Sequence, residues 1–193
     1  MMSSFICMKV AVQPVREAGV ADYLNRIILR MAMRIFITGT PGTGKSSLAA
    51  ALGDQLSIPV FNVGVKARVM GLVEARDDER DADVVDEASV ERIAQAIERA
   101  HDEFVLEGHM VHDAKPREDA TLICATCPIE VLKERLEDRG YSAVKVRENL
   151  DAEIFQVCRT EADEAGWSVV LYDSSVEDPH EFARDFGDHK PDK

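Results

Sequence analysis

The sequence predicts an α/β fold in which one parallel sheet carries helices on both of its faces. Short apolar runs rich in β-branched residues alternate with segments of helical periodicity throughout residues 33–187, which is the pattern of a parallel sheet with crossover helices. A glycine-rich loop joins the first of these runs to the first helical segment. The chain has 193 residues and no repeat or low-complexity linker, so we expect a single domain with one sizeable core.

The first strand is expected at residues 35–37, and the loop after it reads GTPGTGKS from Gly39 to Ser46. This loop fits the pattern G-x-x-x-x-G-K-[ST], and the helix expected at residues 46–56 carries leucines at helical spacing. Glycines let the backbone wrap closely around phosphate oxygens, and the helix N-terminus adds positive charge. Lys45 would reach the β and γ phosphates, and the Ser46 hydroxyl would ligate Mg²⁺. The motif therefore predicts a P-loop that binds a nucleoside triphosphate.

The remaining elements continue the alternation of strands and helices. The sheet should have five parallel strands in all, the other four at residues 58–63, 103–106, 120–126 and 167–172. Further helices are expected around Lys66 and Arg68 and at residues 87–100, 128–139 and 145–165. A last short helix should be opened by Pro179, capped by Asp178, and end near residue 187.

Two stretches are expected to lie outside this alternation. Residues 74–87 hold eight acidic residues and two arginines, a composition typical of a solvated, mobile surface segment. Residues 1–32 contain several methionines, and Met33 directly precedes the first strand, so we interpret them as an extension produced by an upstream start codon. The alternative is a functional extra helix at residues 20–30. The predicted division is an extension (1–32), a P-loop domain (33–187) and a short tail (188–193).

The composition argues against several classes of protein. With 23 Lys and Arg against 36 Asp and Glu, the formal net charge is −13, so strong direct binding to nucleic acid or to anionic membranes is not expected. No apolar run approaches the roughly 20 residues that a membrane-spanning helix needs, and the N-terminus lacks the layout of a signal peptide. We therefore expect a cytoplasmic protein.

The cysteines do not form a recognisable framework. Cys7, Cys124, Cys127 and Cys158 are too few and too scattered for a disulfide scaffold. The C-x-x-C spacing of Cys124 and Cys127 has no second Cys or His pair nearby to complete a zinc site. We interpret Cys124, Cys127 and Cys158 as small apolar residues of the core, and we expect Trp167 to lie in the core as well.

A second candidate for chemistry is the strand end FVLEGH at residues 104–109. In open α/β sheets ligands bind at the carboxyl ends of the strands, so Glu107 and His109 should face the P-loop. Glu107 could hold a Mg²⁺-bound water as a Walker B acid, and His109 could orient a nucleophile or contact the transferred phosphoryl group. The alternative is a strand-end carboxylate and a surface histidine without a catalytic role.

The third candidate is RLEDRGY at residues 135–141, followed by Lys145 and Arg147. Phosphoryl transfer needs cations over the equatorial oxygens of the transferred group. Arginines at a helix end beside a glycine break, above all Arg139, suit a lid that closes over the phosphates and excludes water. The alternative is a solvated, charged helix face.

Taken in order, these segments resemble the adenylate kinase isoenzyme 6 family, which includes archaeal adenylate kinases and a nuclear eukaryotic form. The resemblance covers about residues 33–175 and is carried by ITGTPGTGKSSLAAAL, IPVFNVG, LEGH, LKERLEDRGY and ENLDAEIFQV, which begin at residues 37, 58, 106, 132 and 148. The last two motifs are the specific part, since a P-loop alone does not select a family.

The resemblance implies a nucleoside-monophosphate kinase that transfers the γ-phosphoryl group of ATP to AMP or a related monophosphate, with Mg²⁺. It implies ATP binding by Gly42, Gly44, Lys45, Ser46, Ser47 and Arg139. A monophosphate-binding segment at residues 62–86 would use Asn62, Gly64 and Arg68, and a lid would span residues 138–148. The implied catalytic residues are Lys45, Glu107, His109 and Arg139, and the implied metal ligands are Ser46 and Glu107.

The resemblance also implies ATPase activity and a role in late maturation of the small ribosomal subunit and its rRNA, through small-subunit ribosomal protein number eleven. Two departures from the family pattern bear on monophosphate preference and turnover rather than on ATP binding. NVGVK at residues 62–66 stands where the family often has NVGDL, and Glu107 stands where it often has Asp. Three interpretations stay open: a monophosphate kinase, an ATPase that acts as a ribosome assembly factor, and a kinase of another small metabolite.

Overall fold

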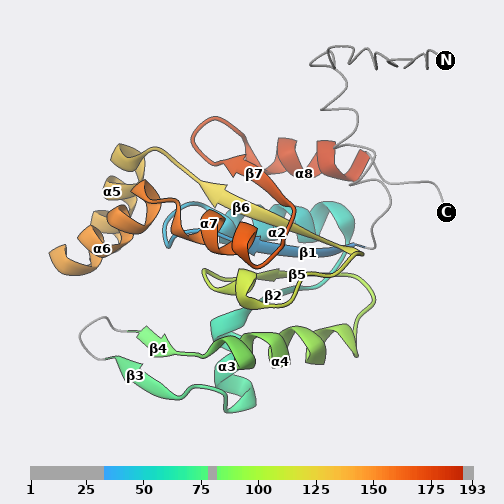
Figure 1. Ribbon diagram of the computed structural model, residues 1–193. Coiled ribbons are helices and arrows are strands. Elements are labelled where there is room, and N and C mark those ends of the chain that lie inside the picture. Colours follow the sequence, from blue (N-terminus) through green and yellow to red (C-terminus); the bar gives the residue numbers. More distant parts are fainter. Residues whose placement is uncertain (1–32, 78–81, 189–193) are drawn as a thin grey trace, which may run out of the picture.

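The computed structural model describes residues 33–77 and 82–188 (Figure 1). Its central feature is a parallel sheet of five strands in the order β2-β5-β1-β6-β7. These strands are β1 (Arg34–Thr38), β2 (Val60–Asn62), β5 (Phe104–Glu107), β6 (Ala120–Thr126) and β7 (Val169–Asp173). The α/β class and the five-stranded parallel sheet predicted from the sequence are confirmed.

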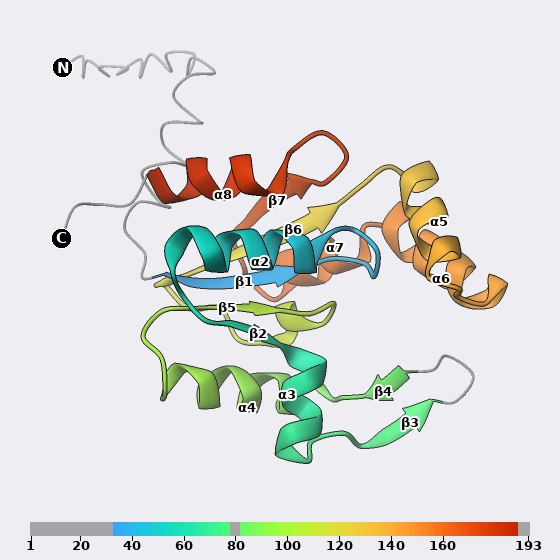
Figure 2. The same ribbon diagram turned by 180° about the vertical axis from the view of Figure 1, so that it is seen from behind.

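Helices cover both faces of this sheet, as Figure 2 shows from behind. One face packs against α2 (Lys45–Leu56) and α8 (Pro179–Asp188), and the other against α4 (Glu87–Glu98) and α7 (Val157–Glu164). Because side chains alternate along a strand, Ile35 and Ile37 belong to the core beneath α2 and Phe36 belongs to the opposite core. Each of these three is at most 1% exposed, and burial of a side chain of this size contributes about 1.5–3 kcal/mol.

The functional elements gather at the carboxyl edge of the sheet, where the strand arrows point in Figures 1 and 2. They are α3 (Val63–Met70), the short helix η1 (Val111–Asp113), α5 (Ile129–Asp138) and α6 (Ala143–Ile154). Helices α5 and α6 pack on each other through a small core of their own, formed by Leu132, Leu136 and Val146 with Cys127. This pair of helices extends beyond the edge of the sheet (Figure 2).

The acidic segment contains secondary structure that its composition did not indicate. Strands β3 (Ala75–Asp77) and β4 (Ala82–Val84) pair antiparallel, and residues 78–81 lie outside the described residues. The sequence predicts a solvated surface segment and no strands here; Ala75, Arg76 and Val84 are exposed as a surface segment requires, and the hairpin is an addition to that prediction. Strand propensity was masked there because charged side chains dominate the sequence.

The prediction of a single helix at residues 145–165 was wrong. Helix α6 ends at Ile154 and α7 begins at Val157, because Gln156 adopts a left-handed backbone conformation with φ 51°. A non-glycine residue in this conformation interrupts a helix without a sequence signal such as Gly or Pro. Smaller differences concern element ends: β2 has only three residues, Pro128 is the N-cap of α5 rather than its first residue, and Trp167 precedes β7.

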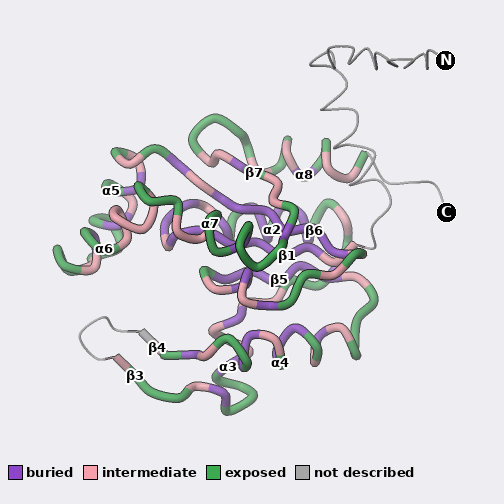
Figure 3. Tube along the Cα trace, in the orientation of Figure 1, coloured by how far each residue is buried: buried purple, intermediate pink, exposed green. Residues whose placement is uncertain are grey.

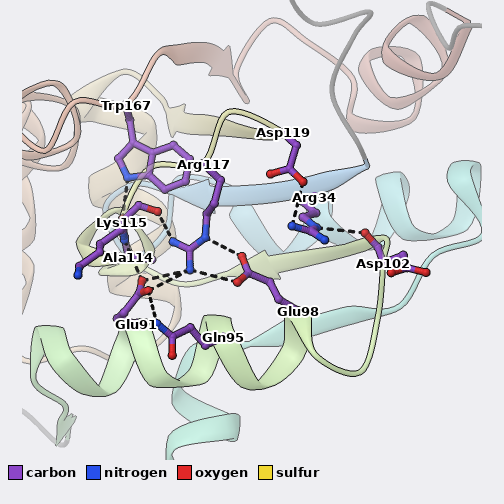
Figure 4. Close-up of polar contacts among 10 residues, drawn as sticks. All are labelled: Arg34, Glu91, Gln95, Glu98, Asp102, Ala114, Lys115, Arg117, Asp119 and Trp167. Atoms are coloured by element: carbon purple, nitrogen blue, oxygen red, sulfur yellow. Dashed lines mark hydrogen bonds and ion pairs between the residues drawn. The ribbon is translucent and has the colours of Figure 1, made fainter.

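The amino ends of the strands are tied together by charged residues (Figure 4). Arg117 Nε lies 2.6 Å from Glu98 Oε1, and its Nη2 lies 3.1 Å from Glu91 Oε2. Arg34 at the start of β1 pairs with Asp119 at 2.9 Å. Trp167 Nε1 donates to the carbonyls of His112 and Ala114, and its burial at 5% exposure confirms its expected place in the core. This cluster lies at the edge of the sheet opposite the P-loop and has a structural role.

Three sequence-based expectations remain to be placed. The extension (1–32) and the possible helix within it lie outside the described residues, as do residues 189–193 of the tail. Asp178 caps α8 as predicted, since its Oδ1 accepts from the N–H groups of His180 and Glu181. Within residues 33–77 and 82–188, none of the helices has the length and apolar character needed to cross a membrane.

Candidate active site

Glycines occupy the positions of the P-loop where the backbone has positive φ. Gly39 has φ 135°, and a Cβ there would lie 2.2 Å from the carbonyl oxygen of Ala125. Gly44 has φ 92° and is the N-cap of α2, with no side chain capping the helix. The N–H groups of Lys45 and Ser46, the first two residues of α2, thus remain available for an anion, whereas the Ser47 N–H donates to the Gly44 carbonyl at 3.1 Å. This is the geometry that the sequence motif predicts for a phosphate-binding loop.

Lys45 is buried and lies across its own loop. Its Nζ donates to the Thr40 carbonyl at 2.9 Å, and Thr43 Oγ1 donates to the same carbonyl at 2.8 Å. Burial lowers the pKa of Lys45, and the positive charge of Arg139 lowers it further, whereas the neighbouring Glu107 acts in the opposite direction. The structure therefore brings Lys45, Glu107 and Arg139 within electrostatic reach of one another.

Glu107 connects the P-loop helix to the start of α3. Its Oε1 accepts from Ser46 Oγ at 3.3 Å and from Asn62 Nδ2 at 2.5 Å. Asn62 is in turn the N-cap of α3, because its Oδ1 accepts from the backbone N–H of Val65 at 3.0 Å. Glu107 is only 6% exposed. Three predicted site residues from three separate elements thus meet at one carboxylate.

The donor atoms at this point fit a magnesium ion. The Ser46 hydroxyl and the Glu107 carboxylate converge at the carboxyl edge of the sheet, beside the first turn of α2. Hard divalent cations take oxygen ligands of these kinds, and Mg²⁺ takes one or two from protein together with phosphate oxygens. Ser46 and Glu107 are the residues that would hold it.

His109 follows Glu107 on the same strand end and is held through its backbone. Its carbonyl accepts from Thr38 Oγ1 at 3.2 Å, and the thiol of Cys158 donates to it at 3.7 Å. The imidazole keeps exposed surface. Its pKa is nevertheless lowered to about 4, mainly by desolvation from the surrounding protein and to a smaller extent by the positive charge of Lys45. His109 is therefore neutral near pH 7 and offers hydrogen bonding rather than positive charge.

His112, which the sequence analysis did not single out, lies behind this strand end. It is 3% exposed, its Nδ1 lies 2.6 Å from Thr38 Oγ1, and its Nε2 lies 2.9 Å from Glu161 Oε2. The imidazole thus links the end of β1 to helix α7. The sequence offered one signal for this residue, since His112 stands three residues after His109 in the same segment.

The two arginines of the RLEDRGY stretch at residues 135–141 have different surroundings. Arg135 Nη1 donates to the Gly42 carbonyl at 3.3 Å and to Ser174 Oγ at 2.7 Å, so this side chain braces the P-loop backbone. Arg139 ends α5, is exposed, and lies close enough to Lys45 to affect its pKa. Of the two, Arg139 is the one whose cation is available to a ligand.

The predicted acceptor residues lie on α3 and at its start. Gly64 is in the first turn of α3, beside Asn62. Arg68 lies on the same helix with 63% of its side chain exposed, and its guanidinium pairs with Asp83 of β4. Arg76 of β3 also pairs with Asp83, at 3.3 Å. The structure thus ties the predicted phosphate contact to the hairpin rather than to the P-loop.

The structure largely confirms the prediction that the cysteines are core residues. Cys124 and Cys127 are buried and free, and Cys158 is free but only half-buried. Burial raises the pKa of Cys124 to about 12 and also raises the pKa of Cys127 and of Cys158. These thiols are therefore protonated near pH 7 and are poor nucleophiles.

One contact to the P-loop was not predicted at all. Thr40 Oγ1 donates to Glu153 Oε2 at 2.6 Å, and the other oxygen of Glu153 accepts from the Cys127 N–H at 3.3 Å. Glu153 belongs to α6, and 113 residues separate it from Thr40. The sequence did carry a signal, because Glu153 lies within the ENLDAEIFQV run that was the most specific part of the family resemblance.

Comparison with known proteins agrees with this geometry. A family model described as an AAA domain matches residues 35–156. The chain is 38% identical over 130 residues to a protein of Methanocaldococcus jannaschii named "Putative adenylate kinase", covering 67% of this chain and 72% of that protein. It is 31% identical over 137 residues to the "Adenylate kinase isoenzyme 6 homolog" of Caenorhabditis elegans, covering 70% of this chain and 75% of that protein.

Solved structures show the same fold at low sequence identity. A shikimate kinase from Acinetobacter baumannii superimposes with a TM-score of 0.55 at 12% identity, covering 83% of this chain and 93% of that one. A sugar kinase from Janibacter has a TM-score of 0.54 at 16% identity, with coverage of 80% and 91%. The chain therefore belongs to the family of P-loop phosphotransferases that contains these archaeal adenylate kinases and the adenylate kinase isoenzyme 6 homologues.

Proposed function

We propose that this protein is a nucleoside-monophosphate kinase that transfers the γ-phosphoryl group of ATP to AMP or a related monophosphate. The observation that carries the proposal is the junction at Glu107. One carboxylate accepts from Ser46 on the P-loop helix and from Asn62 at the start of α3. A kinase needs its donor and acceptor sites side by side, and Glu107 links the elements that would form them.

The donor would be bound by the P-loop. Backbone N–H groups around Gly42 and Gly44 and the N-terminus of α2, including Ser47, would surround the phosphates. Lys45 would exchange the Thr40 carbonyl for phosphate oxygens and compensate the charge that develops there. Ser46 and Glu107 would hold Mg²⁺, and the ion would supply positive charge at the phosphates.

The acceptor would lie against α3, with its phosphate on Arg68 and its approach guided by Asn62 and Gly64. Arg139 would complete the site from the lid, since a cation near Lys45 suits the equatorial oxygens of the transferred group. Neutral His109, fixed by its backbone to Thr38, would orient the attacking oxygen by hydrogen bonding. Transfer would be direct and in line, with positioning and charge supplied by the protein.

Replacement of Lys45 tests the donor half of this proposal. Lys45→Ala should reduce both phosphoryl transfer and ATP hydrolysis by about 100-fold or more, because a preorganised charge is lost at the developing negative charge. Lys133→Ala, which removes a side chain that is 57% exposed on α5, is the matched control and should leave both rates unchanged. Full turnover by Lys45→Ala would contradict the assignment of the P-loop.

A second candidate function is an ATPase that serves ribosome assembly. It is supported by the charge of the chain, which is −13 overall with eight acidic residues between 74 and 87. An acidic surface of this kind complements a basic protein, and small-subunit ribosomal protein number eleven is the partner that the family resemblance suggests. Co-purification of a basic ribosomal protein that ATP releases would support this function in the cytoplasm. The same site could serve both functions.

A further inference from the structure

Glu153 lies where the lid helix returns to the P-loop. Its Oε2 accepts from Thr40 Oγ1 at 2.6 Å and its Oε1 accepts from the backbone N–H of Cys127 at 3.3 Å. The two oxygens therefore bind one donor each, from the P-loop and from the junction between β6 and α5. A single side chain of α6 thus joins three elements at the carboxyl edge of the sheet.

Thr40 is the residue through which Glu153 can act on the nucleotide site. Thr40 is 2% exposed, and its side chain is the donor to Glu153. Its carbonyl, on the same residue, accepts from Lys45 Nζ at 2.9 Å and from Thr43 Oγ1 at 2.8 Å. Before Lys45 turns to phosphate oxygens, that carbonyl holds its ammonium in place within the loop. Glu153 is therefore one residue removed from the cation that the P-loop offers to phosphate.

The attachment of α6 makes this polar contact important. Within α6, Val146 is the one fully buried residue, and it packs on α5 together with the half-buried Leu150. The residues after Glu153, Ile154 and Phe155, are 55% and 73% exposed, and Gln156 turns the chain with φ 51°. Beyond Leu150 the carboxyl end of α6 consequently has little apolar anchorage, and the hydrogen bonds of Glu153 attach it to the P-loop and to Cys127.

We propose that Glu153 is a positioning residue that fixes Thr40, and through it Lys45, and so couples the lid helix α6 to the nucleotide site. The inference rests on the proposed function only in requiring that the P-loop binds the phosphates of ATP. In this role Glu153 would act through Thr40 rather than by contact with the substrates. Its effect is expected on the donor site and not on the acceptor residue Arg68, which belongs to a different element and pairs with Asp83.

Steady-state kinetics with varied ATP and varied AMP test this role. Glu153→Ala should raise KM for ATP about 10-fold, since loss of a charged hydrogen-bond acceptor leaves the buried Thr40 hydroxyl unpaired. KM for AMP should stay within twofold of the wild type. Glu153→Gln keeps an acceptor for Thr40 and should recover at least half of the lost ATP affinity. Glu164→Ala, an exposed glutamate that ends α7, is the control of equal charge change.

A double-mutant cycle separates coupling through Thr40 from a general loss of stability. Thr40→Val removes the donor and should raise KM for ATP by itself, and adding Glu153→Ala should then have less than a twofold further effect. Calorimetric titration with ATP, together with the melting temperature, distinguishes a folded protein with weak binding from an unfolded one. Multiplicative effects of the two substitutions, or equal increases in KM for ATP and AMP, would overturn the inference. Failure of the wild type to bind ATP would instead refute the proposed function.

Discussion

The proposed donor and acceptor sides of the site are built differently. On the donor side Thr38, Thr40, Thr43, Lys45 and Glu107 are each at most 8% exposed, and each has a hydrogen-bond partner within the site. On the acceptor and lid side Arg68 and Arg139 are exposed, and Arg68 pairs with Asp83. Figure 3 shows the contrast, with mostly buried residues along β1 and mostly exposed or half-buried residues along α3, α5 and α6.

This difference indicates how the site would work. A buried, mutually hydrogen-bonded cluster has little freedom to reorganise, so the donor half is already in place before a nucleotide binds. We expect the proposed acceptor half to be completed by movement, since its cations lie on exposed helices and a hairpin. Substitutions on the donor side should therefore affect both hydrolysis and transfer, whereas those on the acceptor side should affect transfer alone.

The largest effect that would sharpen this comparison is expected at Glu107. Glu107→Gln keeps the size of the side chain but removes the charge that Ser46 and Asn62 surround and that would hold Mg²⁺. Hydrolysis and transfer should both fall by about 100-fold, with a higher Mg²⁺ concentration needed for half-maximal rate. A titration of both rates with Mg²⁺ checks this. Unchanged hydrolysis with impaired transfer would place Glu107 on the acceptor side.

A smaller and more selective effect is expected at Arg68. Arg68→Ala should raise KM for AMP by about 10-fold, because a charged hydrogen bond to the acceptor phosphate is lost, while ATP hydrolysis without AMP should not change. Initial rates at varied AMP and at saturating ATP give the measurement.

Two further variants control for the ion pair of Arg68. Arg92→Ala removes an exposed arginine of α4 and should have no effect. Asp83→Asn weakens the competing partner of Arg68 and should change KM for AMP less than fivefold, because exposed ion pairs contribute little. An equal loss of hydrolysis and transfer in Arg68→Ala would break the proposed division of the site.

The smallest effect is expected at Asp86, which caps α4 on the acceptor side. Its Oδ1 accepts from the Ser89 N–H at 2.7 Å, and the side chain and backbone of Ser89 hold the pKa of Asp86 below its ordinary value of 3.8. Asp86→Ala should lower the melting temperature by about 2–4 °C at pH 7. A carboxyl group with a lowered pKa stabilises the native state at pH values above its ordinary pKa. This stabilisation is lost as the pH falls through the lowered pKa.

Melting curves of wild type and Asp86→Ala between pH 7 and pH 2 measure that effect. The difference in melting temperature should persist down to about pH 4 and shrink below it, as the carboxyl group becomes protonated in the native state. A difference that grows on acidification would contradict the role of Asp86 as a cap.

The donor half of the site could be predicted from the sequence because it depends on local pattern and on one topological rule. The P-loop is contiguous, and Glu107 ends a strand whose carboxyl end must lie beside it in a parallel sheet. The structure adds the strand order, in which β1 pairs in parallel with β5 and brings the two strand ends together. The Ser46–Glu107 contact follows from these two facts, although their 61-residue separation hides it from any local pattern.

The rest could not be predicted, for identifiable physical reasons. The break at Gln156 has no glycine or proline, so helical periodicity continues through it in the sequence. The β3–β4 hairpin is masked by its charges. The contact between Glu153 and Thr40 depends on how α6 packs across the sheet edge, which side-chain spacing along α6 does not determine. Arg68 was assigned by resemblance, and its pairing with Asp83 depends on the unpredicted hairpin.

Production of ADP from ATP and Mg²⁺, measured with and without each nucleoside monophosphate, tests the central claim most directly. The account predicts slow hydrolysis alone and a large stimulation by AMP or a related monophosphate, with two ADP formed from each pair of ATP and AMP. Hydrolysis that is indifferent to every monophosphate would contradict a kinase and leave the ATPase as the function of this site.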